Sequence, residues 1–395
     1  MFNNLSFIEQ SYSVAFADFV RLREREGHTI VKMQTGDPDF PTHTNVVKAA
    51  EIALDRGETK YCDSKGLLSL RQAISEKLAL RNGIIASPED NILVTHGAVH
   101  GISMAIRAIV NQGDECIIIE PYWRSYQSNV ILAGGVPVII QTLPEKGFQL
   151  DAEAILNQIT SKTRLIIINT PNNPSGAVYR KEELIKLANG AAKRKVYIIS
   201  DEVYEALTFE RNHYSIASDP DVREWIISAF SFSKTYAMTG WRIGYIAASK
   251  MIIDGMLKLS QFGITSLSPY NQLAAIAALN DETVQAYAEV MRKEYEKRRN
   301  IIKHQIEDTW LKDVITIPEG TFYVLIEMGK FGISSLDLAK RIVHQSGVSF
   351  TPGIAFGDSM DGYLRMCFAT DEKNINIAIK ALLDFKEGEG MDKTE

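Results

Sequence analysis

Seven short runs of hydrophobic residues recur along the middle of the chain, and longer stretches of mixed polar and apolar residues separate them. The runs fall at residues 92–95, 116–119, 137–140, 165–168, 197–200, 226–230 and 243–247. A continuous apolar run of this length is typical of a strand buried on both faces, because helices cover both sides of a parallel sheet. The pattern therefore predicts an α/β fold in which helices cover a mostly parallel seven-stranded sheet.

The flanking parts of the chain follow different patterns. A helix-prone stretch at 16–27 precedes a short strand-like run at 29–33, and a long, charged, periodic stretch at 282–308 predicts a helix. Near the C-terminus, residues 320–326 and 363–368 alternate in the manner of strands. These patterns predict a second, smaller unit of the α+β class.

A chain of 395 residues is longer than one hydrophobic core usually organises. We expect a large domain at residues 45–290, because this range contains all seven runs. The N-terminal segment, residues 1–44, and the C-terminal region, residues 291–395, are expected to form the smaller domain together.

Composition and charge narrow the classes of function. Hydrophobic residues make up 45% and charged residues 23% of the chain, and the net charge of −6 comes without a dense Lys/Arg cluster that would indicate nucleic-acid binding. No apolar run reaches the roughly 18 residues that a membrane span requires, and Met1 to Asn4 do not begin a signal peptide. Three scattered cysteines, Cys62, Cys116 and Cys367, show neither disulfide nor metal-ligand spacing. We therefore expect a cytoplasmic protein without a metal site.

The clearest chemical signature belongs to Lys234, which follows the run 226–230 in the segment SFSKTYAMTGWR, residues 231–242. Burial lowers the pKa of an amine, and a neutral amine is a nucleophile towards carbonyl groups. Arg242, eight residues later, offers a fork of donors that suits an anion such as phosphate. An amine beside a phosphate clamp suggests a Schiff base with pyridoxal phosphate, whereas a lone Ser-Lys pair would indicate only a lysine that extends to solvent.

Two further segments follow neighbouring runs. The run 197–200 leads into Asp201, and a buried carboxylate can keep a pyridinium nitrogen protonated so that the ring accepts electrons. The run 165–168 leads to Asn-Asn-Pro-Ser-Gly at 172–176, which alone would indicate an ordinary turn. All three segments leave the carboxyl ends of predicted parallel strands, where open α/β sheets bind ligands.

Together, residues 172–176, 201–204 and 231–242 resemble, in order and spacing, the motifs of class I aminotransferases of the aspartate aminotransferase fold family. The resemblance extends from about Gly36 to about Thr370. It implies a pyridoxal phosphate-dependent enzyme that moves an amino group from an L-amino acid to a 2-oxo acid by a ping-pong mechanism.

The resemblance assigns roles to the residues of these motifs. Lys234 would carry the cofactor as a Schiff base and shuttle a proton during catalysis. Asp201 would pair with the ring nitrogen, and Asn173 and Tyr204 would hydrogen-bond the phenolic oxygen of the cofactor. The other interpretation of Tyr204 is a core aromatic residue at a helix start.

The start of a helix should hold the cofactor phosphate, because helix N-termini present free N–H groups to anions. Gly97, Ala98 and Val99 follow the run 92–95 and begin such a helix. The side chains that the resemblance adds to this phosphate site are Ser231, Ser233 and Arg242. The family often has a hydroxyl residue at the position of Val99, which leaves only a backbone donor there.

Two aromatic residues complete the cofactor site by resemblance. Trp123 aligns with the aromatic residue that stacks on the pyridine ring, and core packing is the alternative. Tyr61 matches a tyrosine that reaches the phosphate of the neighbouring subunit, which implies a homodimer with shared active sites. The alternative for Tyr61 is an ordinary surface tyrosine.

The substrate carboxylate is assigned to Arg365, because an arginine inside a predominantly apolar strand needs an anionic partner. Gly36 would add a backbone contact to this carboxylate, and Asn173 would border it. His96 and His100 are interpreted as packing residues, since proton transfer is assigned to Lys234.

An acidic substrate side chain usually requires a second cation. One aspartate-specific branch of the family places an arginine within the stretch 261–270, and another has a lysine at the position of Val99, but this chain has neither. We therefore expect a neutral or aromatic amino donor, with pyruvate or 2-oxoglutarate as acceptor. Polar contacts from Lys65 or residues 11–13 stay open. The alternative function is a lyase or synthase of the same fold, such as a C–S β-lyase or an aminocyclopropane-carboxylate synthase.

Overall fold

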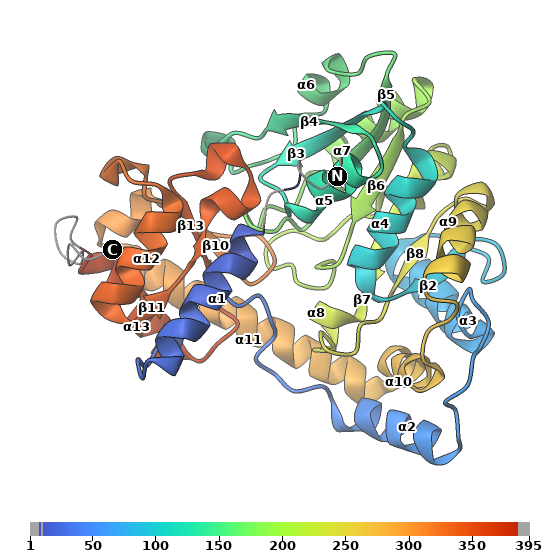
Figure 1. Ribbon diagram of the computed structural model, residues 1–395, viewed down its shortest axis with the longest axis horizontal. Coiled ribbons are helices and arrows are strands. Elements are labelled where there is room, and N and C mark those ends of the chain that lie inside the picture. Colours follow the sequence, from blue (N-terminus) through green and yellow to red (C-terminus); the bar gives the residue numbers. More distant parts are fainter. Residues whose placement is uncertain (1–7, 9–10, 386–395) are drawn as a thin grey trace, which may run out of the picture.

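The computed structural model describes residue 8 and residues 11–385. A seven-stranded sheet with the strand order β2-β8-β7-β6-β5-β3-β4 forms its centre (Figure 1). These strands are β2 Ile92–Thr95, β3 Glu115–Glu120, β4 Val136–Gln141, β5 Thr163–Asn169, β6 Tyr197–Asp201, β7 Ile226–Ser231 and β8 Gly244–Ala247. Each of the seven apolar runs forms one strand of this sheet, and the predicted α/β fold is confirmed.

Only β8 runs against the common direction of the large sheet. The strands β4, β3, β5, β6 and β7 pair in parallel, whereas β8 is antiparallel to both β7 and β2. The connection from β7 to β8 contains only the single-turn helix α8, Phe232–Thr235. A parallel neighbour would require a crossover helix that packs on the sheet. Because this connection has none, the chain returns as β8 beside β7 in the opposite direction.

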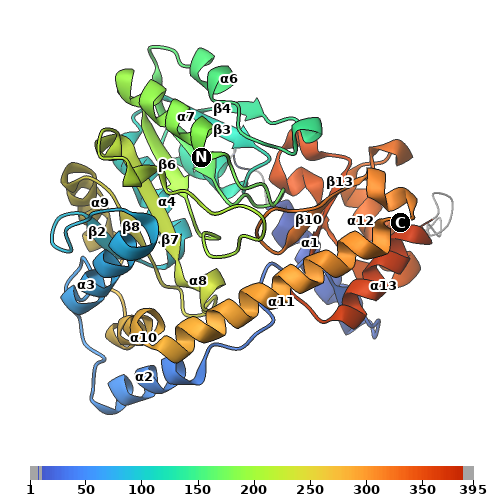
Figure 2. The ribbon, with the colours of Figure 1, turned by 180° about the vertical axis from the view of Figure 1, so that it is seen from behind.

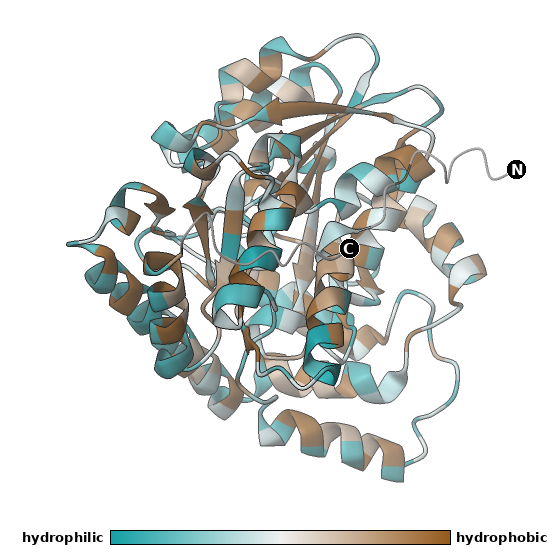
Figure 3. Cartoon of the chain, turned by 60° about the vertical axis from the view of Figure 1, so that its left-hand side comes forward, coloured by the Kyte–Doolittle hydropathy of each residue, from teal (hydrophilic) through white to brown (hydrophobic). Residues whose placement is uncertain are grey.

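Helices cover both faces of the large sheet because successive strand residues point to opposite sides. Ile118 packs on the face that carries α4 Gly97–Ile109, α5 Ser125–Leu132 and α9 Lys250–Gly263. Ile117 and Ile119 pack on the other face, against α2 Thr44–Asp55, α3 Leu68–Lys77, α6 Ala152–Asn157, α7 Lys181–Lys193 and α10 Pro269–Asn280. Figure 3 shows the strands as hydrophobic ribbons between helices of mixed character.

The smaller unit is built from both ends of the chain. Its antiparallel sheet has the order β12-β13-β10-β9, with β9 Ile315–Thr316, β10 Tyr323–Glu327, β12 Thr351–Pro352 and β13 Tyr363–Cys367. A second, parallel pair joins β1 Val31–Lys32 to β11 Val348–Ser349. The helices α1 Tyr12–Arg25, α12 Ser335–Ser346 and α13 Glu372–Leu383 pack around these strands. The N-terminal segment therefore lies with the C-terminal region, as the α+β prediction requires.

Helix α11, Glu282–Ile306, runs from beside α10 in the large unit to the smaller unit (Figure 2). Val284 near its start packs in the core of the large unit, and Met291 packs in the core of the smaller one. The domain limits at 44/45 and 290/291 stay predictions. Among the described helices, none combines the length and hydrophobicity needed to cross a bilayer. Met1 to Asn4, which the signal-peptide prediction concerned, lie outside the described residues.

Candidate active site

The carboxyl ends of β5, β6 and β7 lie side by side at one edge of the large sheet. A cavity of about 350 Å³ opens at this edge, with walls from both the large and the smaller unit. It brings together nearly all of the residues proposed from the sequence: Gly36, Ala98, Val99, Trp123, Asn173, Asp201, Tyr204, Ser231, Ser233, Lys234, Arg242 and Arg365. A volume of this size suits a small organic ligand. We call this space the main cavity.

Lys234 lies in the helical turn α8, directly after β7, and its Nζ donates a hydrogen bond to the backbone oxygen of Gly36. Burial lowers the pKa of this amine to about 8. The positive charges of Arg365 and Arg242 act in the same direction, and the carboxylate of Asp37 opposes them. A larger fraction of this amine is therefore uncharged near neutral pH than for a solvated lysine, which makes it a candidate nucleophile.

Asp201 ends β6, and its carboxylate accepts hydrogen bonds from the hydroxyl of Tyr126 and from the backbone N–H of Val203. Burial raises the pKa of this carboxyl group to about 6, although both hydrogen bonds act to lower it. The charged carboxylate is thus destabilised, since no cation among the described residues acts on it. A protonated ring nitrogen is a ligand group that would supply the missing positive charge.

Arg365 lies on β13 and is 4% exposed. Its guanidinium donates to Asn173 Oδ1 at 3.0 Å, to the backbone oxygen of Gln34 at 2.8 Å and to Thr351 Oγ1 at 3.2 Å. Its Nε is buried without a hydrogen-bond partner among the described residues, and no described carboxylate forms an ion pair with it. A buried guanidinium without an anion is unfavourable, so this group is suited to bind a carboxylate that a ligand brings.

A guanidinium and a helix start meet at another part of the main cavity wall. Gly97 begins α4 with a φ of +70°, and a Cβ at this position would lie 2.6 Å from Nη2 of Arg242. The glycine therefore allows the guanidinium to approach the first turn of the helix. The hydroxyl of Ser231 accepts a hydrogen bond from the backbone N–H of Ser233 at 3.1 Å, and both residues line the cavity. This combination of donors suits a phosphate group.

Tyr204 and Tyr323 share a hydrogen bond between their hydroxyl groups, 3.0 Å long, and both rings are buried. Tyr204 lies in a turn after β6, not at a helix start as the alternative interpretation assumed. A Cβ at Gly36 would lie 2.4 Å from the hydroxyl oxygen of Tyr323, so the backbone at this position approaches the tyrosine pair closely. Trp123 and Val99 form an apolar part of the same cavity.

Residues 28–382 match the family model described as aminotransferase class I and II, which covers most of the chain. The chain belongs to this family. The predicted transaminase activity and the dependence on pyridoxal phosphate are thereby confirmed.

Curated and solved relatives show the same family. The aromatic-amino-acid aminotransferase 2 of Thermococcus litoralis is 38% identical over 351 residues, which are 89% of this chain and 90% of the relative. The aspartate/prephenate aminotransferase of Thermus thermophilus is 38% identical over 357 residues, 90% of this chain and 91% of the relative. The solved structure of the Thermus thermophilus aspartate aminotransferase with maleate has a TM-score of 0.92 at 35% identity, and the match covers 96% of this chain and 98% of that chain.

The residues of the aminotransferase cavity fit pyridoxal phosphate on three observations. The amine of Lys234 has a lowered pKa, the buried carboxyl of Asp201 has a raised one, and Arg242 lies against the first turn of α4. These groups are a nucleophile for an aldehyde, a partner for a ring N–H and a binding site for a phosphate. The role of each individual residue stays a prediction.

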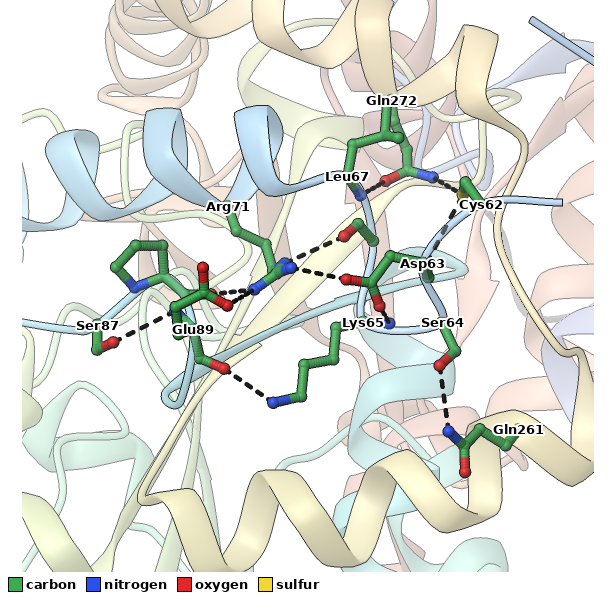
Figure 4. A network of polar contacts seen from close by, with 12 residues as sticks. Cys62, Asp63, Ser64, Lys65, Leu67, Arg71, Ser87, Glu89, Gln261 and Gln272 are labelled. Carbon is green, nitrogen blue, oxygen red and sulfur yellow. Dashed lines mark hydrogen bonds and ion pairs between the residues drawn. The ribbon is translucent and has the colours of Figure 1, made fainter.

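Of the proposed cofactor residues, Gly97 and Tyr61 are not among those that line the cavity. Gly97 lies against the lining residue Arg242, whereas Tyr61 belongs to a surface loop. The Tyr61 side chain is 86% exposed. Polar contacts hold the loop that carries it (Figure 4): the buried Arg71 donates to the carboxylate of Asp63 at 2.9 Å, and Gln272 accepts from the loop backbone at 2.7 Å. An exposed tyrosine on a firmly held loop is suited to contact a second subunit.

His96 and His100 do not line the cavity. Their rings lie 5.9 Å apart, and burial lowers the pKa of both imidazoles, with Arg242 adding to the effect on His96. This geometry agrees with neutral packing residues. Of the polar contacts left open, Lys65 donates to the backbone oxygen of Glu89 at 2.8 Å and lies outside the cavity, whereas Ser13 lines it.

Asn169, Tyr126 and Tyr323 are among the cavity residues that sequence reasoning missed. Asn169 donates from Nδ2 to the backbone oxygen of Asp201 at 2.9 Å and accepts from the backbone N–H of Asn173 at 2.8 Å. Its place at the end of an apolar run was a usable signal. Tyr126 and Tyr323 gave no such signal. Tyr126 meets Asp201, and Tyr323 meets Tyr204, only because elements far apart in the sequence pack together.

Proposed function

We propose that this aminotransferase uses a neutral or aromatic L-amino acid as amino donor and pyruvate or 2-oxoglutarate as acceptor, by a ping-pong mechanism. The observation that carries the proposal is the set of cations that line the main cavity. Lys234, Arg242 and Arg365 are the cations among its described lining residues. Each has a role with the aldehyde, the phosphate or the α-carboxylate. The remaining wall at Val99 and Trp123 is apolar and suits an uncharged donor side chain.

The relatives support transamination and leave the donor open. The printed names include an aromatic-amino-acid aminotransferase and an aspartate/prephenate aminotransferase at the same 38% identity. Both aromatic and acidic substrates therefore occur among close members of the family. The apolar wall of the main cavity favours the aromatic or neutral class for the amino donor of this chain.

The proposed division of work follows from the cavity. Pyridoxal phosphate supplies, when bound, an aldehyde that takes up the amino group and a ring that withdraws electrons. Arg365 and Asn173 orient the substrate carboxylate, which fixes the position of the substrate Cα. Nζ of Lys234 then accepts the proton from Cα as a general base and returns it as a general acid. Asp201 stabilises positive charge on the ring nitrogen throughout.

The proposed active unit is a homodimer in which Tyr61 reaches the partner subunit. Its 86% exposure and the fixed loop around it support this assignment. Sedimentation at micromolar concentration tests it, and a monomer with full activity would contradict it. We also place the enzyme in the cytoplasm, since Cys62, Cys116 and Cys367 are all free thiols, which suits a reducing compartment.

A panel of amino donors tests the proposed function directly. Each donor is added to the holoenzyme, and the absorbance of the bound cofactor reports transfer of the amino group before any acceptor is present. Aromatic and neutral donors should convert the cofactor faster than aspartate. A protein that stays colourless with added pyridoxal phosphate would rule out the proposal. Release of ammonia and an oxo acid without an acceptor would instead identify the lyase alternative.

A further inference from the structure

Tyr323 lines the main cavity, and the sequence motifs assign it no role. It begins β10 opposite Cys367 of β13, and Arg365 stands two residues before Cys367 on the same strand. The register therefore places Tyr323 and Arg365 on one face of the small sheet as diagonal neighbours. Strand pairing thus fixes Tyr323 beside the residue that is proposed to bind the substrate carboxylate.

The guanidinium of Arg365 lies over the ring of Tyr323. Its Cζ is 4.1 Å from the centroid of that ring and 4.9 Å from the centroid of Phe356. Aromatic rings attract a cation at such distances, and the attraction is stronger where water is excluded. The two rings therefore stabilise the charged guanidinium and limit its movement, which keeps it in place for a ligand carboxylate.

The hydroxyl of Tyr323 reaches Tyr204, which belongs to the large unit. The two hydroxyl oxygens are 3.0 Å apart, and Tyr204 is the one hydrogen-bond partner of this hydroxyl among the described residues. The backbone at Gly36 closes the space on another side, because a Cβ there would lie 2.4 Å from the Tyr323 oxygen. The hydroxyl of Tyr323 is therefore confined beside that of Tyr204.

The direction of this hydrogen bond determines what Tyr204 can do. A phenol hydroxyl has one proton to donate, and its oxygen can accept as well. If Tyr204 donated to Tyr323, its proton would not be available to a ligand. If Tyr323 donates, Tyr204 keeps its own proton for a ligand oxygen, and polarisation strengthens that second hydrogen bond. Because the Tyr323 hydroxyl has no other described acceptor, only this second arrangement satisfies both hydroxyl groups once a ligand oxygen lies beside Tyr204.

We propose that Tyr323 is a positioning residue with two separable roles. Its hydroxyl donates to Tyr204 and so directs the Tyr204 proton to the phenolic oxygen of the cofactor, and its ring holds Arg365 for the substrate carboxylate. This inference rests on the proposed function and on the assignment of the phenolic oxygen to Tyr204. The hydroxyl acts on the cofactor and the ring acts on the substrate, so substitutions that remove one and keep the other separate the two roles.

The role of the hydroxyl is tested on the holoenzyme without any substrate, by following the cofactor absorbance as a function of pH. A weaker hydrogen bond from Tyr204 leaves more negative charge on the phenolic oxygen, and this charge holds the proton at Nζ of Lys234 more strongly. The midpoint pH should therefore rise in Tyr323→Phe by on the order of 0.5 to 1 pH unit, which is the effect of one hydrogen bond. An unchanged midpoint would overturn the inference.

A double-mutant cycle shows whether Tyr323 acts through Tyr204. Tyr204→Phe should itself raise the midpoint pH, and the addition of Tyr323→Phe should then produce no further shift. A shift of the same size in both backgrounds would contradict the proposed path. The matched control is Tyr295→Phe, because Tyr295 is buried in the same core and does not line the main cavity. This control should leave the midpoint unchanged, and a shift as large as that of Tyr323→Phe would also count against the inference.

The role of the ring is tested by titrating butyrate, a monocarboxylate without an amino or oxo group, into the same holoenzymes. Tyr323→Phe keeps the ring and should change the Kd of butyrate by less than about 2-fold, whereas Tyr323→Leu should raise it on the order of 10-fold. Equal weakening in both variants, or in neither, would refute the separation of roles. Failure of every donor–acceptor pair, with the midpoint shift of Tyr323→Phe intact, would refute only the proposed function.

Discussion

Replacing Asp201 with asparagine should stabilise the cofactor-free protein at neutral pH while it removes transaminase activity. Burial raises the pKa of the Asp201 carboxyl from its usual 3.8 to about 6. One pKa unit corresponds to about 1.4 kcal/mol, so the charged carboxylate destabilises the folded apoprotein by about 3 kcal/mol. Asparagine has no charge to bury, and it keeps an oxygen for the Val203 N–H and an amide that can donate to the Tyr126 hydroxyl.

The expected pH dependence follows from the direction of the Asp201 shift. Because the pKa in the folded state lies above that in the unfolded state, the folded state binds more protons between about pH 4 and pH 6. The contribution of this group to stability is therefore lost as the pH rises through that window, and the full penalty persists above it. The advantage of Asp201→Asn should be greatest at about pH 7.5 and should vanish near pH 4.

Urea denaturation of the apoprotein measures this advantage, with wild type and Asp201→Asn compared at both pH values. Asp221→Asn, at an exposed carboxylate, is the matched control and should change stability little at either pH. In the holoenzyme, Asp201→Asn should lower kcat by on the order of 100-fold or more, because charge on the ring nitrogen loses its partner. A variant that is less stable than wild type at neutral pH, or equally stabilised at both pH values, would refute the electrostatic reasoning.

Three further predictions concern other residues of the cavity. The rate at which the apoprotein binds pyridoxal phosphate should rise with pH and level off above about pH 8, as measured by stopped-flow absorbance. The reason is that burial lowers the pKa of Lys234 to about 8 and only the neutral amine attacks the aldehyde. Gly97→Ala should raise the cofactor Kd about 10-fold or more in equilibrium titration, since the added Cβ would meet Arg242 and the residue has a φ of +70°. The control Gly113→Ala, at a φ of +83° with open space around it, should leave the cofactor Kd unchanged. Arg365→Lys should raise the KM of every amino donor alike, because one ammonium replaces a fork, and an effect confined to acidic donors would contradict this assignment.

The large sheet could be predicted from the sequence because its strands are buried on both faces, so each one is a continuous apolar run bounded by polar residues. The direction of β8 could not be predicted from its run, since the sequence of a strand is the same in either pairing direction. The small sheet was harder to predict for a different reason. Its edge strands β9 and β12 contain two residues each, and the pairing of Val31 with Val348 joins parts of the chain that lie far apart in sequence. No local pattern encodes such contacts.

The candidate site divides in the same way. Lys234, Asp201 and Asn173 could be placed because each follows an apolar run, and parallel strands bring their carboxyl ends to one edge. Arg124 is next to Trp123 in the sequence, yet nothing local indicates that it pairs with Asp358, 234 residues away. Tyr126 likewise shows its relation to Asp201 only after α5 has packed on the sheet. Residues at strand ends are predictable from pattern, and residues that meet across elements are not.

Three charges in the main cavity are unfavourable in the protein alone. Asp201 is a buried carboxyl with a raised pKa, Lys234 is an amine with a lowered pKa, and Arg365 is a buried guanidinium that pairs with no described carboxylate. Each of these residues has a matching ligand group. A ring N–H pairs with Asp201, an aldehyde reacts with the neutral amine of Lys234, and a carboxylate pairs with Arg365. Binding at this site therefore relieves electrostatic strain that folding has already imposed. The same destabilisation that weakens the apoprotein makes the cavity selective, because only a cofactor and a substrate that together bring all three groups satisfy it.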